Sequence, residues 1–315
     1  MCVKKTFYKP LIIGVLFTFF WLFCYLMQSN PNSDFEKIQY TLFYIGLSML
    51  IVAGFDSIHI SRVIVCLTFI YIIYLISIGL SFKSILVSGS SYNYISILLL
   101  FALMLYYIAM LNKGKDISLT LSIVYFLLCI WAYGRGGIVA AAFLNIALLL
   151  KKIIAGDNKW KKRFYVLIAI IILIITFILI QNGEIFETIF PKFYLKGTTD
   201  EQRLNIWRLF IQNNNKDFLS FLFGSDTSLI RSDHNLHNFA LQAYATFGFI
   251  GFIVLIFLII KSAIMMIKLE KYDHLILFVF LLIRASTDRV FFQGYCEIFL
   301  YYFLFMPYYE LPQSR

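Results

Sequence analysis

Ten stretches of the sequence are almost entirely apolar, and several of them reach the roughly 18–20 residues that a helix needs to cross the hydrocarbon core of a bilayer. The chain of 315 residues is 61% hydrophobic and has a mean hydropathy of +0.82. The apolar runs are continuous, whereas a membrane β-barrel would have short segments of alternating polarity. The sequence therefore predicts an all-α fold, a polytopic bundle of about ten transmembrane helices that forms one integral membrane domain over residues 1–315.

One connection between the predicted spans differs from the others because it is long and polar. It covers residues 182–238, between the seventh and eighth spans, and a connection of this length is usually functional or disordered. It contains the amphipathic segment DEQRLNIWRLFIQN, in which Leu204, Trp207 and Ile211 share one helical face. We expect this loop to be folded and packed on the outer membrane surface. The predicted spans cover about residues 10–27, 39–55, 63–81, 93–111, 117–133, 137–150, 164–181, 239–260, 273–286 and 291–309.

The distribution of Lys and Arg predicts the orientation of the spans. If the N-terminus is cytoplasmic, most basic residues of the short connections fall on the cytoplasmic side, where membrane proteins concentrate them. The C-terminus is then cytoplasmic too, and residues 182–238 lie outside. The net charge of +10 therefore marks the cytoplasmic side and is no sign of nucleic-acid binding. Apart from the long loop, the outer side carries Lys37, Lys83, Arg135, Arg284 and Arg289.

The cysteines and histidines do not predict a metal site. None of the five cysteines belongs to a CxxC pair, and most lie in apolar runs, where cysteine behaves as a small hydrophobic residue. His234 and His237 are three residues apart, but the carboxylate–histidine set of a zinc site does not accompany them. We therefore expect chemistry that needs no metal.

Arg135 is the first of three polar residues that the predicted topology brings to the outer side. It lies between glycines in WAYGRGGIVAAAFLNIALLL, residues 131–150, at a turn between two spans. Gly136 and Gly137 begin a small-residue face that allows close helix packing. An arginine at the membrane edge is costly unless it is useful, so we expect it to bind an anion. The alternative is an interfacial arginine that reaches lipid phosphates.

Arg203 is the second of these residues, and it lies in the amphipathic segment of the long loop. Trp207 is four residues further on, so the two side chains share a helical face. A guanidinium beside an indole suits a ligand with both phosphate and sugar, because the fork binds oxyanions and the ring stacks on a pyranose. The alternative is a solvated helix in which Arg203 pairs with Asp200 or Glu201.

His237 is the third residue, at the entrance of the eighth predicted span. Asp233 and Asn235 are good N-cap residues, and they would place His237 in the first turn of that span. An uncharged imidazole can accept a proton, and first-turn amides attract oxyanions, so His237 is a candidate general base beside an anion site. The alternative is an interfacial histidine that only forms hydrogen bonds in the headgroup layer. His234 is the weaker candidate because it precedes the span.

These residues belong to one ordered pattern. An arginine stands among small residues at the start of a span, a second arginine precedes an aliphatic-Trp pair in the long loop, and His-Asn is followed by Leu-Gln and by GxxG. Its members are Gly134 to Gly137, Arg203 with Ile206-Trp207, His237-Asn238, Leu241-Gln242, and Gly248 with Gly251. In order and spacing, the pattern resembles that of the O-antigen ligase and polymerase superfamily, which are bacterial integral membrane glycosyltransferases. The resemblance covers roughly residues 120–260.

The resemblance implies an enzyme of the bacterial inner membrane with its active site on the periplasmic face and no cofactor. Its donor would be an oligosaccharide carried on undecaprenyl pyrophosphate, and its acceptor a sugar hydroxyl. Arg135 and Arg203 would bind the pyrophosphate, whose growing charge fixed cations can stabilise without a metal. His237 would deprotonate the acceptor hydroxyl. Trp207, Asn238 and Gln242 would contact or orient the substrate.

A second basic segment, RASTDRVFFQGY, lies at the outer end of another predicted span. Arg284 and Arg289 in this segment could extend the anion site. Asp288 could equally neutralise them, and both interpretations remain open.

Within this superfamily the sequence favours a polymerase, which joins lipid-linked repeat units and can work with a chain-length regulator protein. The chain is short, rich in Phe (34) and Tyr (21), and loosely matched to the pattern. An O-antigen ligase, which transfers the finished chain to lipid A-core, needs the same donor chemistry. A transporter of lipid-linked saccharides is the third alternative, but it predicts charges deep within several spans, whereas the polar residues here gather on one side.

Overall fold

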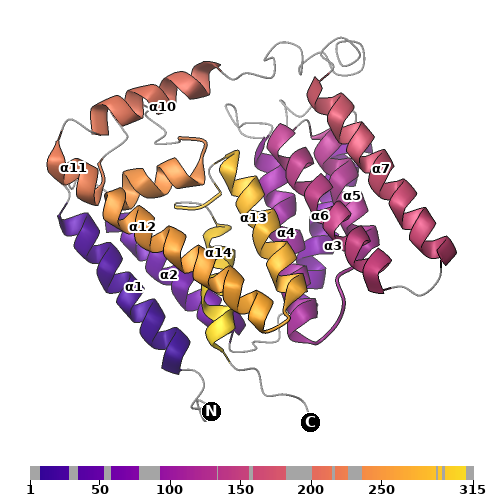
Figure 1. Ribbon diagram of the computed structural model, residues 1–315, viewed down its shortest axis with the longest axis horizontal. Coiled ribbons are helices and arrows are strands. Elements are labelled where there is room, and N and C mark those ends of the chain that lie inside the picture. Colours follow the sequence, from indigo (N-terminus) through magenta and orange to yellow (C-terminus); the bar gives the residue numbers. More distant parts are fainter. Residues whose placement is uncertain are drawn as a thin grey trace. The chain divides into compact units, whose positions relative to one another are not determined.

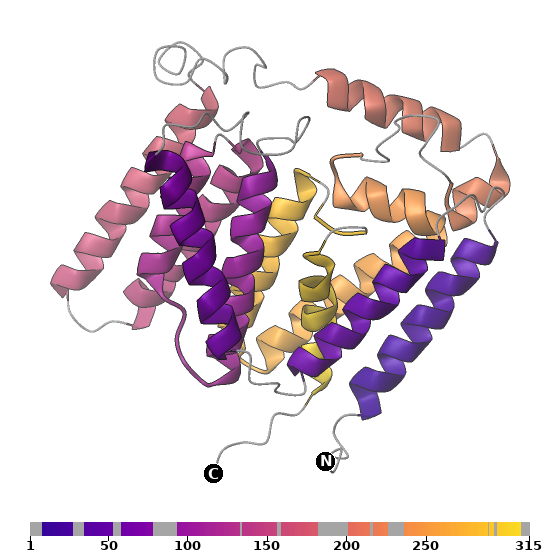
Figure 2. The same cartoon turned by 180° about the vertical axis from the view of Figure 1, so that it is seen from behind.

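The computed structural model describes residues 8–27, 35–52, 58–77, 93–132, 134–155, 159–181, 201–214, 217–225, 236–288, 290–292 and 295–309. Every element of regular structure in these ranges is a helix, which confirms the predicted all-α class. A helix occupies each of the ten segments predicted as spans (Figures 1 and 2). Three helical segments in the described ranges are long and apolar enough to cross a membrane, namely Ile95–Asn112, Gly136–Ile154 and Phe239–Lys268. The chain is thus a helical membrane protein.

The chain forms two compact units, which are described separately here. Unit 1 comprises Met1–Asp56, Glu201–Phe278 and Ala285–Arg315, and unit 2 comprises Ser57–Asp200 and Val279–Arg284. The helices of unit 1 are α1 (Tyr8–Leu26), α2 (Phe35–Val52), α10 (Glu201–Asn214), α11 (Phe218–Phe223), α12 (Phe239–Lys268) and α14 (Glu297–Phe305), with the 3₁₀ turn η3 (Met306–Tyr308). Those of unit 2 are α3 (Ile58–Ser77), α4 (Asn93–Asn112), α5 (Leu119–Trp131), α6 (Arg135–Ala155) and α7 (Lys159–Gln181). The remaining helix, α13 (Tyr272–Ser286), contributes residues to both units.

Several helix boundaries differ from the predicted ones by a few residues or more, and the physical reason can be given at two of them. α6 extends to Ala155, well beyond the predicted end at residue 150, because Lys151 and Lys152 continue the helix and basic side chains are favourable near a helix C-terminus. α14 begins only at Glu297, although the predicted span begins at residue 291. Phe292 has a φ of 57°, which is incompatible with a right-handed helix. Residues 290–292 are instead buried as non-helical chain.

α12 is broken at Gly248, where φ is 67° and ψ is −173°, and Figure 1 shows the change of direction. Glycine adopts this φ without the steric cost that a side chain would add. A Cβ at Gly248 would clash with the backbone of Leu222 at the end of α11, and a Cβ at Gly224 would clash with the carbonyl of Ala245. The Ser225 amide donates to that same carbonyl at 2.8 Å. The break therefore fixes the direction of the first part of α12 against α11.

α10 packs against the first part of α12. Phe210 of α10 forms a buried cluster with Leu236 and Ala245, and Ile206 lies against the same cluster. Leu204 and Ile211 are 43% and 44% exposed, and the expected packing of their face on the outer membrane surface stays a prediction. The stripe that packs within unit 1 includes Ile206 and Phe210. Arg203 and Trp207 lie on the same side as this stripe.

Candidate active site

His237 immediately precedes the N-cap of α12, and this corrects the expected position in its first turn. The cap is Asn238, whose side-chain oxygen accepts from the amides of Ala240 and Leu241 at 2.9 and 3.2 Å. Asparagine is a strong N-cap because its short side chain reaches amides that have no partner within the helix. His237 is therefore one residue outside the capped end, where its direction is set by loop backbone and not by the helix. The predicted caps Asp233 and Asn235 lie outside the described residues, as does His234.

The backbone of His237 has a φ of 52°, in the left-handed region that non-glycine residues seldom adopt. The residues on both sides of it are fixed by side chains. The Trp207 indole N–H donates to the Leu236 carbonyl at 2.7 Å, and the Leu236 amide donates to the Gln242 side-chain oxygen at 3.2 Å. A strained conformation persists only where its surroundings over-determine it, and such residues cluster at functional sites. Leu236 and Asn238 are the two fixed points here.

The imidazole of His237 pairs with Asp288, which follows the end of α13. The distance between Nδ1 and the carboxylate Oδ1 is 3.3 Å, and the two side chains are 17% and 8% exposed. Because a carboxylate can only accept, the ring nitrogen facing it carries the proton. The other nitrogen, Nε2, is then the acceptor of the neutral ring. This is the tautomer that a general base needs when a carboxylate orients it from behind.

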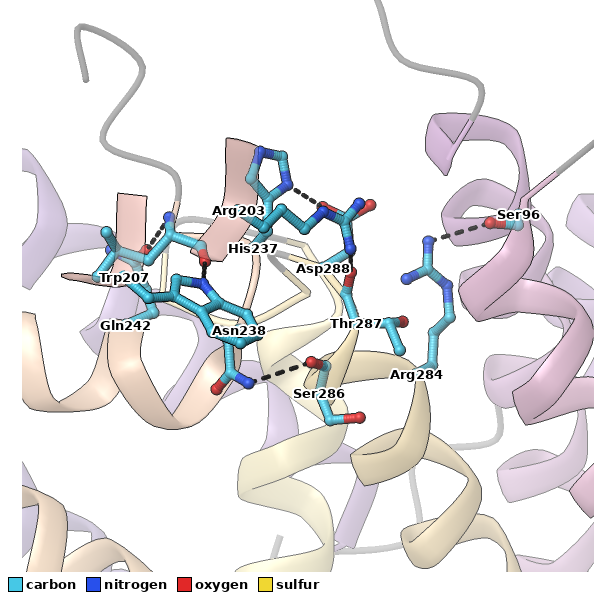
Figure 3. A network of polar contacts seen from close by, with 11 residues as sticks. Ser96, Arg203, Trp207, His237, Asn238, Gln242, Arg284, Ser286, Thr287 and Asp288 are labelled. Carbon is cyan, nitrogen blue, oxygen red and sulfur yellow. Dashed lines mark hydrogen bonds and ion pairs between the residues drawn. The ribbon is translucent and has the colours of Figure 1, made fainter. Parts of the chain in front are cut away.

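The end of α13 supplies two further contacts to the same network, which Figure 3 shows from close by. Arg203 Nη1 donates to the Thr287 carbonyl at 2.9 Å, and Asn238 Nδ2 donates to the Ser286 carbonyl at 3.2 Å. The last carbonyls of a helix have no partner within it and carry the negative end of its dipole, so they attract amide and guanidinium donors. The guanidinium of Arg203 is thereby held at the residue next to Asp288. Arg203 and His237 converge on one three-residue segment.

This network combines the groups that transfer a proton and stabilise an anion. His237 offers a ring nitrogen whose partner carboxylate can also stabilise the imidazolium formed when the ring takes up a proton. Arg203 presents a planar fork of N–H donors, which is the geometry with which a guanidinium binds a phosphate. Both side chains are only partly buried. The arrangement suits attack by a hydroxyl on a centre that carries an anionic leaving group.

Several residues that the sequence singled out support the site by fixing its backbone. Trp207 and Gln242 hold Leu236, and Asn238 caps α12 and reaches the end of α13. The predicted contacts of these three residues with a substrate stay predictions. The sequence raised Asp288 only as a neutraliser of neighbouring arginines, and its pairing with His237 was not predicted.

The remaining candidate residues are Arg135, Arg289 and Arg284. Arg135 is the first residue of α6 in unit 2, and its side chain lies outside the described part of the chain, so its approach to Arg203 and His237 stays a prediction. Arg289 also lies outside the described residues. The sequence predicted that Arg284 lies at the outer end of a span, where it could extend the anion site. Its side chain is fully buried in unit 2 and donates to Ser96 Oγ at 3.0 Å.

Among the described residues, no group of three or more His, Cys, Asp or Glu side chains could hold a metal ion. A scan of the chain against protein-family models, a search of curated proteins and a search of solved structures each found no match.

Proposed function

We propose that the protein is an O-antigen polymerase. It joins oligosaccharide repeat units carried on undecaprenyl pyrophosphate at the periplasmic face of the bacterial inner membrane. In this proposal the chain crosses the membrane about ten times, both termini are cytoplasmic, and residues 182–238 form the periplasmic loop that carries α10. The strong bias of Lys and Arg toward one side of the short connections supports this topology.

The observation that carries the proposal is the pairing of His237 with Asp288 beside Arg203. The three side chains come from segments far apart in the chain, and each is fixed by contacts within unit 1. Two of the three also belong to the sequence pattern that resembles the O-antigen ligase and polymerase superfamily. A base, its orienting carboxylate and a guanidinium are the groups that this reaction requires.

The proposed reaction starts with proton transfer from the acceptor hydroxyl to His237 Nε2. The hydroxyl oxygen attacks the anomeric carbon of the donor sugar, and the bond between that carbon and the pyrophosphate oxygen breaks. The electron pair leaves on undecaprenyl pyrophosphate, whose added charge Arg203 stabilises, while Asp288 stabilises the imidazolium. The proton then passes from His237 to solvent. The products are the lengthened oligosaccharide and free undecaprenyl pyrophosphate.

Arg135 is proposed as the second cation at the pyrophosphate. A pyrophosphate leaving group presents oxygens on two phosphorus atoms, and two guanidinium groups can neutralise it where one cannot. The reaction then needs neither a metal nor a nucleotide. Trp207 is proposed to offer an exposed part of its ring to a sugar, and a chain-length regulator is proposed as a protein partner.

Deletion of the gene tests this proposal and separates it from the two alternatives. Loss of a polymerase leaves lipopolysaccharide capped with a single repeat unit, because ligation still proceeds. Loss of a ligase leaves bare core, and loss of a transporter leaves bare core with lipid-linked repeat units retained on the cytoplasmic side. The lipopolysaccharide of the deletion strain is therefore compared by gel electrophoresis, and either bare-core result would contradict the polymerase.

Complementation of the deletion strain tests the residues. His237→Ala is expected to lower the polymerisation rate by about 10²–10⁴-fold, the usual contribution of a general base. Arg203→Ala and Arg135→Ala are each expected to cost about 10²–10³-fold, as loss of a charge-stabilising donor does. Arg208→Ala is the matched control, because Arg208 lies on the exposed side of α10. Normal long chains from the His237→Ala strain, with the variant present in the membrane, would remove His237 from the role of base.

A further inference from the structure

Arg284 is a charged side chain that is fully buried in the last turn of α13. Its neighbours along that helix, Phe280, Leu281 and Ala285, are buried and apolar. A guanidinium in such a place is far more costly to bury than a leucine would be, so a structural task is the natural explanation for it. The sequence suggested substrate binding for this residue, but a side chain with no exposed surface cannot be reached by a substrate.

Arg284 bonds to Ser96 near the start of α4, and residues of α5 and α6 also lie close to Ser96. Arg284 Nη2 donates to Ser96 Oγ at 3.0 Å, and the Tyr125 hydroxyl of α5 donates to the Ser96 carbonyl at 3.4 Å. Gly137 of α6 lies so close that a Cβ there would be 2.7 Å from Ser96 Cβ. All of these residues belong to unit 2. Within unit 2, Arg284 is therefore bonded at a point where α4, α5 and α6 approach one another.

The residues that follow Arg284 hold the candidate active site. Ser286 and Thr287 accept from Asn238 and Arg203 through their carbonyls, and Asp288 pairs with His237. Only Ala285 separates Arg284 from Ser286, and each helical residue advances the chain by about 1.5 Å, so movement at Arg284 must reach these carbonyls. Figure 3 draws the bond from Arg284 to Ser96 and the contacts of Ser286, Thr287 and Asp288 with Asn238, Arg203 and His237.

We propose that Arg284 is a positioning residue for this site, and that it acts through Ser96. By fixing the last turn of α13, it keeps Ser286, Thr287 and Asp288 where Asn238, Arg203 and His237 contact them. The link to catalysis rests on the proposed function, whereas the positioning itself does not. The same serine contacts the first turn of α6, which begins with Arg135.

Hydrogen exchange measured by mass spectrometry on the purified protein tests the positioning without any assay of activity. The readout is exchange of the amides in residues 236–241, which lie in unit 1, whereas Arg284 and Ser96 belong to unit 2. Ser96→Ala and Arg284→Met are each expected to raise that exchange about fivefold or more, as loosened local structure does. A role confined to the packing of unit 2 would not change it.

Ser122→Ala is the matched control, because Ser122 is also a fully buried serine of unit 2 and its hydroxyl bonds to Asn145 instead. This variant is expected to leave exchange in residues 236–241 unchanged. The double variant Ser96→Ala/Arg284→Met is expected to resemble Arg284→Met alone, because both changes break the same bond. If Arg284→Met does not fold, Ser96→Ala decides the question.

The outcomes separate this proposal from the proposed function. Unchanged exchange in folded Ser96→Ala and Arg284→Met protein would overturn the positioning role, even if the wild-type protein polymerises. An equal rise in the Ser122→Ala control would also overturn it, since any defect in unit 2 would then suffice. The expected exchange pattern in a protein that does not polymerise repeat units would support the positioning role and contradict the function. With an active protein, Ser96→Ala is expected to lower the rate of chain growth about tenfold or more.

Discussion

At the scale of single residues, the conformation of His237 is set by its neighbours more than by its own preference. Trp207 and Gln242 form hydrogen bonds with the backbone of Leu236, and Asn238 caps α12. Asp288 pairs with the imidazole ring of His237. Four side chains thus fix one residue at a φ of 52°, a conformation that costs a non-glycine residue about 1–3 kcal/mol. The expected benefit is that the ring arrives at Asp288 already oriented, so that little reorganisation accompanies proton transfer.

Substitution of His237 by glycine separates this strain from function. His237→Gly removes the base but relieves the backbone, because glycine adopts positive φ at no steric cost. We expect the glycine variant to be inactive, yet more stable to unfolding than His237→Ala by about 1 kcal/mol. Thermal unfolding of both variants in detergent measures this difference. An alanine variant as stable as the glycine variant would mean that residue 237 is not held in the left-handed region.

Parts of the candidate site could be predicted from the sequence at this scale. Arg203, Trp207 and His237 stood out because spacing and residue type express local chemistry. Asp288 could not be assigned to His237, because 51 residues separate the two and only the packing of the α13 end against residues 236–238 joins them. Its one signal was an acidic residue at the outer end of a predicted span. Asn238 was not predicted as the cap because Asp233 and Asn235 are N-cap residues of the same quality, and the sequence does not show which of the three the helix uses.

At the scale of elements, the break in α12 determines where the site stands. A continuous helix would carry Asn238 and Gln242 away along one axis, whereas the break at Gly248 lets the first part of α12 follow α11 and α10. The Ala245 carbonyl, three residues before Gly248, accepts a hydrogen bond from the Ser225 amide. Backbone groups freed at a break within a membrane protein must be satisfied in this way. Trp21 of α1 stacks on Phe247 with centroids 3.4 Å apart, which fixes the break from the other side.

Gly248→Ala is expected to damage the fold of unit 1 and with it the activity. The added Cβ would meet the backbone of Leu222, and the positive φ is unfavourable for alanine, so a loss of roughly 3 kcal/mol or more is expected. Gly46→Ala in α2 is the control, because nothing lies within 4 Å of its Cβ position and alanine favours helix. Thermal unfolding and lipopolysaccharide chain length report on both variants. Equal stability of the two would contradict the close approach of α11 to the break.

The helices themselves were well predicted because long apolar runs leave the chain few alternatives. Their ends were predicted less well, since they depend on short-range chemistry that hydropathy does not register. The lysines at the end of α6 extend it, and the left-handed Phe292 delays the start of α14. The break in α12 was signalled only by Gly248 and Gly251, and glycines are common in membrane helices.

At the scale of the whole molecule, α13 is the helix that contributes to both units, and its end supplies acceptors to the candidate site. Other buried polar groups serve the interior of one unit. In unit 1, the buried Glu297 accepts from the Tyr301 hydroxyl at 2.8 Å and from Thr41 at 3.3 Å, which ties α14 to α2. In unit 2, Asn145 bonds to Ser122 and so joins α6 to α5. Buried hydrogen bonds therefore join helices within each unit, in addition to the packing of apolar side chains.

The most direct test of the central claim is polymerisation by the purified protein in lipid vesicles supplied with repeat units on undecaprenyl pyrophosphate. We expect a ladder of lengthening saccharides, with one undecaprenyl pyrophosphate released for each new linkage. Asp288→Asn is expected to reduce the rate about 10²-fold or more, because the amide can favour the wrong tautomer of His237, while Arg208→Ala keeps it. An unchanged rate in Asp288→Asn, or no chain growth by the wild-type protein under conditions where a known polymerase is active, would contradict the claim.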